Sequence, residues 1–197
     1  MSRRHYIAAG GEVIPEGCVF LAPLSENDLK DHVSGESFVV DGQLAWNANE
    51  KAYLVTLGGA YTRVAHIVVP DMGITTKMTT VYEYKEVGSS NFRPACFGAA
   101  YSGGDTYPYV LPFVFGGARG SANQWKKFVQ TWDNGAFKAW KNGVLYNTQT
   151  INTTINSTCN TGLSLGYVLG SQHSGSYYIK NMRIYNRILS QQEINDL

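Results

Sequence analysis

Short runs of alternating apolar and polar residues make up most of this sequence, and turn residues separate them. This alternation is the pattern of a β-strand with one buried and one solvated face. Such runs, or short apolar runs between turns, occur at 18–22, 38–40, 44–46, 52–57, 64–69, 79–87, 95–101, 109–115 and 163–169. No amphipathic helical pattern exceeds two turns, so the sequence predicts an all-β fold of packed antiparallel sheets.

The clearest local pattern lies at 125–147, WKKFVQTWDNGAFKAWKNGVLYN, and predicts a meander of three antiparallel strands. Phe128 and Trp132 fall on one face of the first strand, because side chains alternate between the two faces. Asn and Gly tolerate positive φ, so the dipeptides at 134–135 and 142–143 predict the two turns. The second turn is expected to be of type I′.

The last 21 residues, YYIKNMRIYNRILSQQEINDL, predict a bent strand followed by one short helix. The gap between Ile179 and Met182 breaks the alternation, which predicts a β-bulge at 180–181. Ser190 and Glu193 have the spacing of a capping box, in which each side chain bonds the backbone amide of the other residue. The helix is expected to lay an apolar face on the sheets, formed by Leu189, Ile194 and Leu197.

These two segments resemble the concanavalin A-like, laminin G-like domains. The C-terminal segment is similar to the closing signature of that family, I-x-x-(V/M)-R-I-Y-N-R followed by L-S-x-x-E-I. Residues 125–147 resemble its W-x-x-(V/F)-x-x-T-(Y/W)-D-N-G hairpin, and 21–47 resembles its opening strand and D-x-(S/V)-G turn. The resemblance implies a two-sheet antiparallel jelly-roll β-sandwich with a short C-terminal helix. It also implies that the first strand, near 19–21, lies beside the last, near 182–185.

Length and composition fit one domain that spans residues 1–197, because no linker, repeat or low-complexity tract divides the chain. The formal net charge is only +1, which gives no reason to expect nucleic acid or an anionic membrane as a partner. Cys18, Cys96 and Cys159 are far apart and odd in number. We therefore expect buried free thiols, and neither a disulfide framework nor a metal cluster.

The location of the protein stays open at this stage. Gly10, Gly11 and Glu12 interrupt the apolar run near the N-terminus, so no secretory signal peptide is expected. The longest apolar stretch, 109–117, contains Pro112 and is too short to span a membrane, so no membrane insertion is expected. We expect synthesis in the cytoplasm, with a virion as one destination.

Catalytic residues are not expected. The glucanase branch of the resembled family carries its carboxylates on one strand as E-x-D-x-x-E, where alternation points them all into the cleft. Here the nearest approach is Glu83 and Glu86, whose spacing of three places them on opposite faces of a strand. The sequence also lacks a G-x-S-x-G nucleophile elbow and a phosphate-binding loop.

A calcium ion is left open, because laminin G-like domains often hold one through loop oxygens. The candidate carboxylates are those of Asp31, Asp105 and Asp133. They are not grouped as in a calcium-binding loop, so we expect them to form turns, and the metal site stays unassigned.

The best candidate for a ligand site is the Gly-rich stretch AYSGGDTYPYV. Aromatic rings stack on sugar faces, and Tyr101, Tyr107 and Tyr109 lie in it together with Asp105. His173, in GSQHSGS, is a further candidate contact. In the alternative interpretation these tyrosines pack on the sandwich with their hydroxyls in water. The tryptophans of the meander are expected in the core or on a sheet face: Trp125, Trp132 and Trp140.

Two functions remain open from the sequence. The first is a non-catalytic recognition module for carbohydrate or a glycosylated surface, an interpretation that depends on family analogy. The second is a structural or adhesion protein of a phage or virus-like particle, which makes protein–protein contacts in an assembly. The absence of an export signal favours the second, and the aromatic loop favours the first.

Overall fold

The computed structural model describes residues 6–7, 13–58, 64–87, 95–97, 123–150, 162–166 and 175–197. In this part of the chain, an eight-stranded antiparallel sheet has the order β12-β11-β10-β8-β14-β6-β5, and β3 also pairs with β14. Its strands are β3 (Cys18–Ala22), β5 (Gln43–Asn47), β6 (Ala52–Leu57), β8 (Lys77–Val87), β10 (Trp125–Asp133), β11 (Ala136–Lys141), β12 (Val144–Thr150) and β14 (Gly175–Tyr185).

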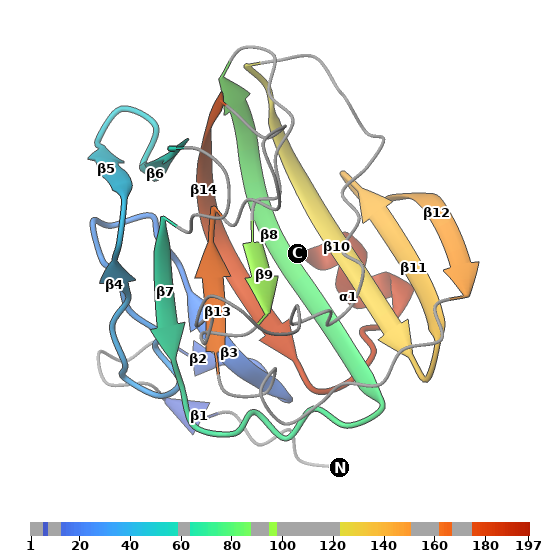
Figure 1. Ribbon diagram of the computed structural model, residues 1–197. Helices are drawn as coiled ribbons and strands as arrows, with labels where there is room; N and C mark the ends of the chain where they lie inside the picture. Colours follow the sequence, from blue (N-terminus) through green and yellow to red (C-terminus); the bar gives the residue numbers. More distant parts are fainter. Residues whose placement is uncertain are drawn as a thin grey trace, which may run out of the picture.

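A smaller sheet packs on one face of this large sheet, as the jelly-roll prediction requires. Its order is β4-β7-β13-β9, with bounds Val39–Val40, Ala65–Val68, Gly162–Leu165 and Ala95–Phe97. A separate pair joins β1 (Tyr6–Ile7) to β2 (Val13–Ile14). Figure 1 shows the small sheet in front of the large one and the short helix α1 (Gln191–Asp196) behind it. The fold is therefore a two-sheet antiparallel sandwich, as predicted.

The predicted strands agree with the observed ones wherever the structure describes them. Strands β3 and β6 have the predicted bounds, and β8 begins at Lys77, two residues before the predicted start. The predicted strand at 109–115 lies outside the described residues. The dipeptide at Asp41 and Gly42 does not close a hairpin: both amides donate to the Val64 carbonyl oxygen at 2.9 Å, and the chain crosses from β4 in the small sheet to β5 in the large one.

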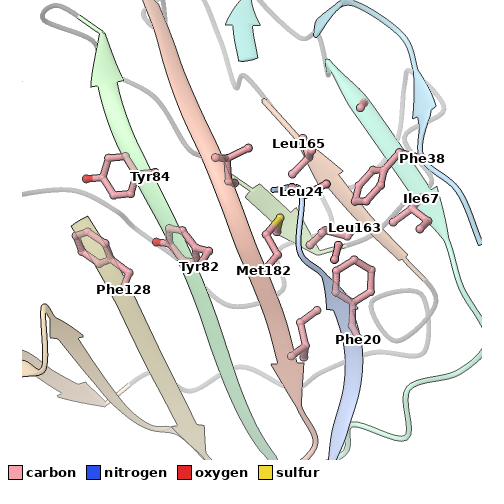
Figure 2. Packing of buried hydrophobic residues seen from close by; sticks show 14 of the residues in the cluster. Phe20, Leu24, Phe38, Ile67, Tyr82, Tyr84, Phe128, Leu163, Leu165 and Met182 are labelled. Carbon is pink, nitrogen blue, oxygen red and sulfur yellow. The ribbon is translucent and has the colours of Figure 1, made fainter. Parts of the chain in front are cut away.

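The main core fills the space between the two sheets. Figure 2 shows Phe20 and Met182 of the large sheet facing Ile67, Leu163 and Leu165 of the small sheet. On neighbouring strands of the large sheet, Tyr82, Tyr84 and Phe128 form a second group of rings on the same face. Each such side chain contributes about 1.5–3 kcal/mol when fully buried, so this layer is the main source of stability.

A second core lies on the opposite face of the large sheet, under α1. Leu189 and Ile194 are buried there, and Leu197 packs against them, as the apolar spacing predicted. These side chains pack on four residues at one end of this sheet face: Val81, Val129, Trp140 and Tyr185. The capping box is confirmed: Glu193 N donates to Ser190 Oγ at 3.2 Å, and Ser190 N donates to Glu193 Oε2 at 2.8 Å.

The last strand runs through the middle of the large sheet and carries the predicted bulge. Its register against β8 shifts between Lys180 and Arg183, and Asn181 adopts a φ of 54°. The shift lets the strand keep Ile179 and Met182 on the core side despite their odd spacing. Tyr178 and Lys180 consequently face away from the core. The register Arg183↔Leu21 confirms that the first and last predicted strands pair.

The turns of the meander are also confirmed. Asn134 and Gly135 have φ values of 46° and 99°, and Asn142 and Gly143 have 51° and 81°. Positive φ at both central residues is the signature of a type I′ turn, which only residues such as Asn and Gly adopt readily. Cys18 is a buried free thiol, as predicted, and burial raises its pKa to about 12.

Candidate functional site

The half-exposed end of the large sheet's outer face, the face turned away from the small sheet, is the best candidate site. Strand register aligns four residues there in one row across the sheet. Trp125 of β10 lies opposite Lys85 of β8, Lys85 opposite Tyr178 of β14, and Tyr178 opposite Leu54 of β6. All four side chains are half-buried, whereas the other end of this face lies under α1.

The two aromatic rings of this row lie beside two ammonium groups, that of Lys85 in the row and that of Lys180, two residues farther along β14. The ring centroids of Trp125 and Tyr178 are 6.5 Å apart, with an interplanar angle of 42°. Lys180 Nζ lies 3.9 Å from the Trp125 ring centroid. Lys85 Nζ lies 5.1 Å from the Tyr178 centroid and 5.8 Å from that of Trp125. These are cation–π distances, so both lysines extend along the aromatic surface.

The turn between β5 and β6 adds a carboxylate and an amide. Asn47 Oδ1 accepts from the backbone amides of Asn49 and Glu50, at 3.0 and 3.1 Å, and so fixes the turn. This places Glu50 beside the row, where its Oε1 is 2.5 Å from Lys85 Nζ and its Oε2 accepts from Trp125 Nε1 at 3.2 Å.

Hydrogen bonds therefore orient both rings of the site. Asn47 Nδ2 donates to the Tyr178 hydroxyl at 3.2 Å, in the same way that Glu50 holds the indole. The bond from Lys85, followed by that from Trp125, lowers the pKa of Glu50, which keeps this carboxylate charged. We call the six residues the Trp125 cluster: Asn47, Glu50, Lys85, Trp125, Tyr178 and Lys180.

The charges of the Trp125 cluster are not balanced. Lys85 is paired with Glu50, but Lys180 has no carboxylate within 4.0 Å in the part of the chain that the structure describes. Its cross-strand neighbour on β8 is Glu83, which instead accepts from Asn181 Nδ2 at 3.0 Å. The cluster thus offers an aromatic surface, fixed hydrogen-bonding groups and one ammonium group, that of Lys180, that forms no salt bridge within the described residues.

The two carboxylates considered for catalysis lie on opposite faces of β8, as predicted. Glu83 is on the outer face with Asn181, while Glu86 is on the inner face. There Glu86 Oε1 accepts from the Tyr84 hydroxyl at 3.2 Å and lies 3.5 Å from Lys126 Nζ. Burial, followed by the charge of Glu86, raises the pKa of Tyr84. The bonds to Glu86 Oε1 connect this buried group across β8 and β10.

The five predicted ligand residues lie outside the described residues: Tyr101, Asp105, Tyr107, Tyr109 and His173. Among the candidate calcium ligands, Asp31 forms a turn, as expected: its carboxylate accepts from the amides of Leu21, Val33 and Ser34 and from the Ser34 hydroxyl. Asp133 is 3.9 Å from Lys77 Nζ. Within the described ranges, no three His, Cys, Asp or Glu side chains are grouped so as to hold a metal ion.

The sequence indicated one part of the Trp125 cluster and missed the rest. Alternation already places Trp125 on the opposite face from Phe128, and the structure shows it on a sheet face, half-buried, as one of the two predicted positions. Trp132 and Trp140 lie in the two cores. Tyr178 and Lys180 could have been assigned to the outer face by the same alternation, but only strand register brings them to Trp125.

Comparisons with known proteins identify the family. A laminin G-type model of the concanavalin A-like lectin/glucanases superfamily matches residues 75–195, which is more than half of the chain. The chain therefore belongs to this superfamily. No curated protein matches the sequence. None of the helices in the described ranges is long and apolar enough to cross a membrane.

Solved structures confirm the fold. Domain 4 of AbnA, an extracellular GH43 arabinanase from Geobacillus stearothermophilus solved with arabinotriose, has a TM-score of 0.63 at 19% identity, over 91% of this chain and 97% of that one. The receptor-binding domain of botulinum neurotoxin C/D mosaic serotype has a TM-score of 0.65 and 13% sequence identity, and the match covers 92% of this chain and 50% of that one. The binding domain of Paraclostridial Mosquitocidal Protein 1 has a TM-score of 0.61 and 14% sequence identity, and the match covers 92% of this chain and 51% of that one. This chain spans about half the length of the latter two.

Proposed function

From its place in the concanavalin A-like superfamily, we propose that this chain is a single, non-catalytic domain that binds carbohydrate or a glycosylated surface. The observation that carries the proposal is the half-exposed Trp125 and Tyr178 pair, held by side-chain hydrogen bonds on the outer face of the large sheet. The fold neighbours support it, because one was solved with arabinotriose and others are receptor-binding domains.

The chemistry of the Trp125 cluster suits a sugar. The C–H face of a sugar ring is apolar and packs on an aromatic ring, while its hydroxyls need planar hydrogen-bonding groups at the rim. Trp125 and Tyr178 provide the aromatic surface, and Asn47 and Glu50 provide an amide and a carboxylate beside it. Since both rings are already oriented, binding loses little side-chain entropy.

We propose that the tyrosine-rich stretch at 100–110 contributes to the same function. Tyr101, Tyr107 and Tyr109, with Asp105, precede β10 in the sequence, and His173 precedes β14 by two residues. They therefore precede the strands that carry Trp125 and Tyr178. Substitution of each tyrosine by Ala tests this contribution separately from that of the sheet.

The sheet site is tested by a glycan array followed by calorimetry on the sugars it retains. Trp125→Ala should weaken binding about tenfold or more, the usual loss for an aromatic contact at the centre of an interface. The matched control is Tyr146→Ala, because Tyr146 is an exposed aromatic residue on β12, which is an edge strand of the large sheet as far as the structure describes it. Unchanged affinity in Trp125→Ala, with losses in the tyrosine variants, would move the site to the tyrosine-rich stretch at 100–110.

The absence of catalysis is proposed from the placement of the carboxylates. Glycoside hydrolysis requires two carboxyl groups that flank one bond, and Glu83 and Glu86 lie on opposite faces of the sheet. We expect no reducing-sugar release from a broad panel of glycans at any pH. Release that disappears in Glu83→Gln or Glu86→Gln would show that the protein is an enzyme.

A second candidate function is a protein–protein contact in an assembly, such as a phage or virus-like particle. Strand β12, which pairs only with β11 in the described part of the chain, exposes Val144, Leu145 and Tyr146 and contains no charged residue. Exposed, uncharged edge strands are the sites at which sheets pair with other chains. Stable self-association without any glycan binding would favour this function over the first.

A further inference from the structure

We propose that the Trp125 cluster selects acidic sugars, in which a carboxylate or sulfate on the ring pairs with the ammonium group of Lys180. This inference rests on the proposed carbohydrate-binding function and adds the chemical class of the ligand. The arrangement of charges on the outer face carries it.

The outer face carries more lysines than glutamates around Trp125. Alternation along β8, β10 and β14 places Lys85, Lys127 and Lys180 on this face together with Glu83, and the turn between β5 and β6 adds Glu50. Three positive charges against two negative ones leave an excess of one. Lys85 and Glu50 neutralise each other at 2.5 Å, so the excess lies at Lys127 and Lys180, the two outer-face lysines beside Glu83.

The position of Lys180 is specific. Its Nζ lies 3.9 Å from the centroid of the Trp125 ring, the surface on which a sugar would stack. The acidic residue opposite it in the strand register, Glu83, is held by Asn181 at 3.0 Å. Asn181 is the bulge residue, with a φ of 54°, so the same distortion that bends the strand supplies the amide that occupies Glu83.

An acidic sugar would satisfy both parts of this arrangement at once. A cation over an exposed aromatic ring gains less than the same cation in a charge-assisted hydrogen bond to an anion. The ligand carboxylate or sulfate would therefore draw Lys180 Nζ off the indole, and the sugar ring would take its place on Trp125. A neutral sugar has to displace the same ammonium group without a compensating bond, and should bind more weakly.

Paired ligands that differ only in charge test the inference by calorimetry. We compare oligosaccharides of a neutral hexose with those of the corresponding uronic acid, and the same neutral oligosaccharides with their sulfated forms. The unmodified protein should bind at least one acidic form about tenfold more tightly than its neutral partner, as one charge-assisted bond predicts. The preference should decrease as the salt concentration rises, because part of it is electrostatic. The uronic acid and sulfated oligosaccharides together show whether a carboxylate or a sulfate is bound.

Lys180→Met removes the charge and keeps the length of the side chain. It should abolish the preference for the acidic form while binding to the neutral form is retained. Lys138→Met, an exposed lysine on β11, is the control and should keep the preference. Lys180→Gln serves the same purpose if the Met variant has a lowered melting temperature.

The outcomes separate the two proposals. Equal affinity of the unmodified protein for neutral and acidic sugars, or a preference that survives in both Lys180 variants, would overturn the inference and leave carbohydrate binding intact. No binding of either kind of sugar would overturn the proposed function itself.

Discussion

At the scale of single residues, Asp31 shows how one side chain fixes a turn that the family signature marks. The residue is fully buried, and its two carboxylate oxygens accept four hydrogen bonds, at 2.6 to 3.1 Å. One of them comes from Leu21 in β3, so the turn is tied to the first strand of the large sheet. A buried carboxylate is tolerated here because donors surround it.

Replacement of Asp31 by Asn should destabilise the protein by about 1–3 kcal/mol, which is the usual cost of leaving a buried hydrogen-bond donor without an acceptor. The Asn amide has one acceptor oxygen and directs an NH₂ group at the donors of Ser34. Urea unfolding measures the change. Asp133→Asn is the control, because Asp133 is exposed and its ion pair with Lys77 Nζ is long, at 3.9 Å. This substitution should change stability by less than about 0.5 kcal/mol. Equal effects of the two substitutions would contradict this account.

At the scale of elements, α1 illustrates how a helix of only six residues is held in place. Glu193 closes the capping box and also accepts two bonds from Arg187, at 2.7 and 3.1 Å. The Arg187 side chain in turn packs on Gly17, where a Cβ atom would lie 2.9 Å from Arg187 Cδ. The cap and the bidentate pair together fix the helix over the second core.

The contribution of Glu193 should depend on pH. The bond from Arg187, followed by those from Ser190, lowers the pKa of Glu193 from 4.5 to about 2. Because the folded-state pKa is the lower one, the stabilisation is complete above pH 4.5 and is lost as pH falls toward 2. Glu193→Gln should therefore be less stable than the unmodified protein near pH 7, and the difference should decrease through this range. A difference that is the same at pH 7 and pH 3 would contradict the mechanism.

Elements were easier to predict from the sequence than the site. The strands, the Asn-Gly turns, the bulge at 180–181 and the helix cap depend on neighbours within a few residues, and local patterns record them. The Trp125 cluster depends on the register of β10, β8, β14 and on the turn before β6. Register is set by the packing of the whole sheet, so the sequence showed the face of Trp125 but not its neighbours.

At the scale of the whole molecule, the last strand closes the fold. In the described part of the chain, β14 pairs with β8 along one side and with β6 and β3 along the other, so it lies between the two halves of the large sheet. Figure 1 shows it running the full length of that sheet. Without it, β3, β6 and β5 have no hydrogen-bonded connection to β8 and β10, and Tyr177, Ile179, Met182 and Ile184 leave the main core.

A chain truncated after residue 174 should therefore not fold, because it loses the central strand and four side chains of the main core. We expect no cooperative urea transition and strong binding of a hydrophobic dye. A chain truncated after Leu189 keeps β14 and loses only α1, so it should still unfold cooperatively, at a lower urea concentration, since Ile194 no longer covers the second core. A cooperative transition in the shorter chain would show that the two halves of the sheet are joined by contacts other than those of β14.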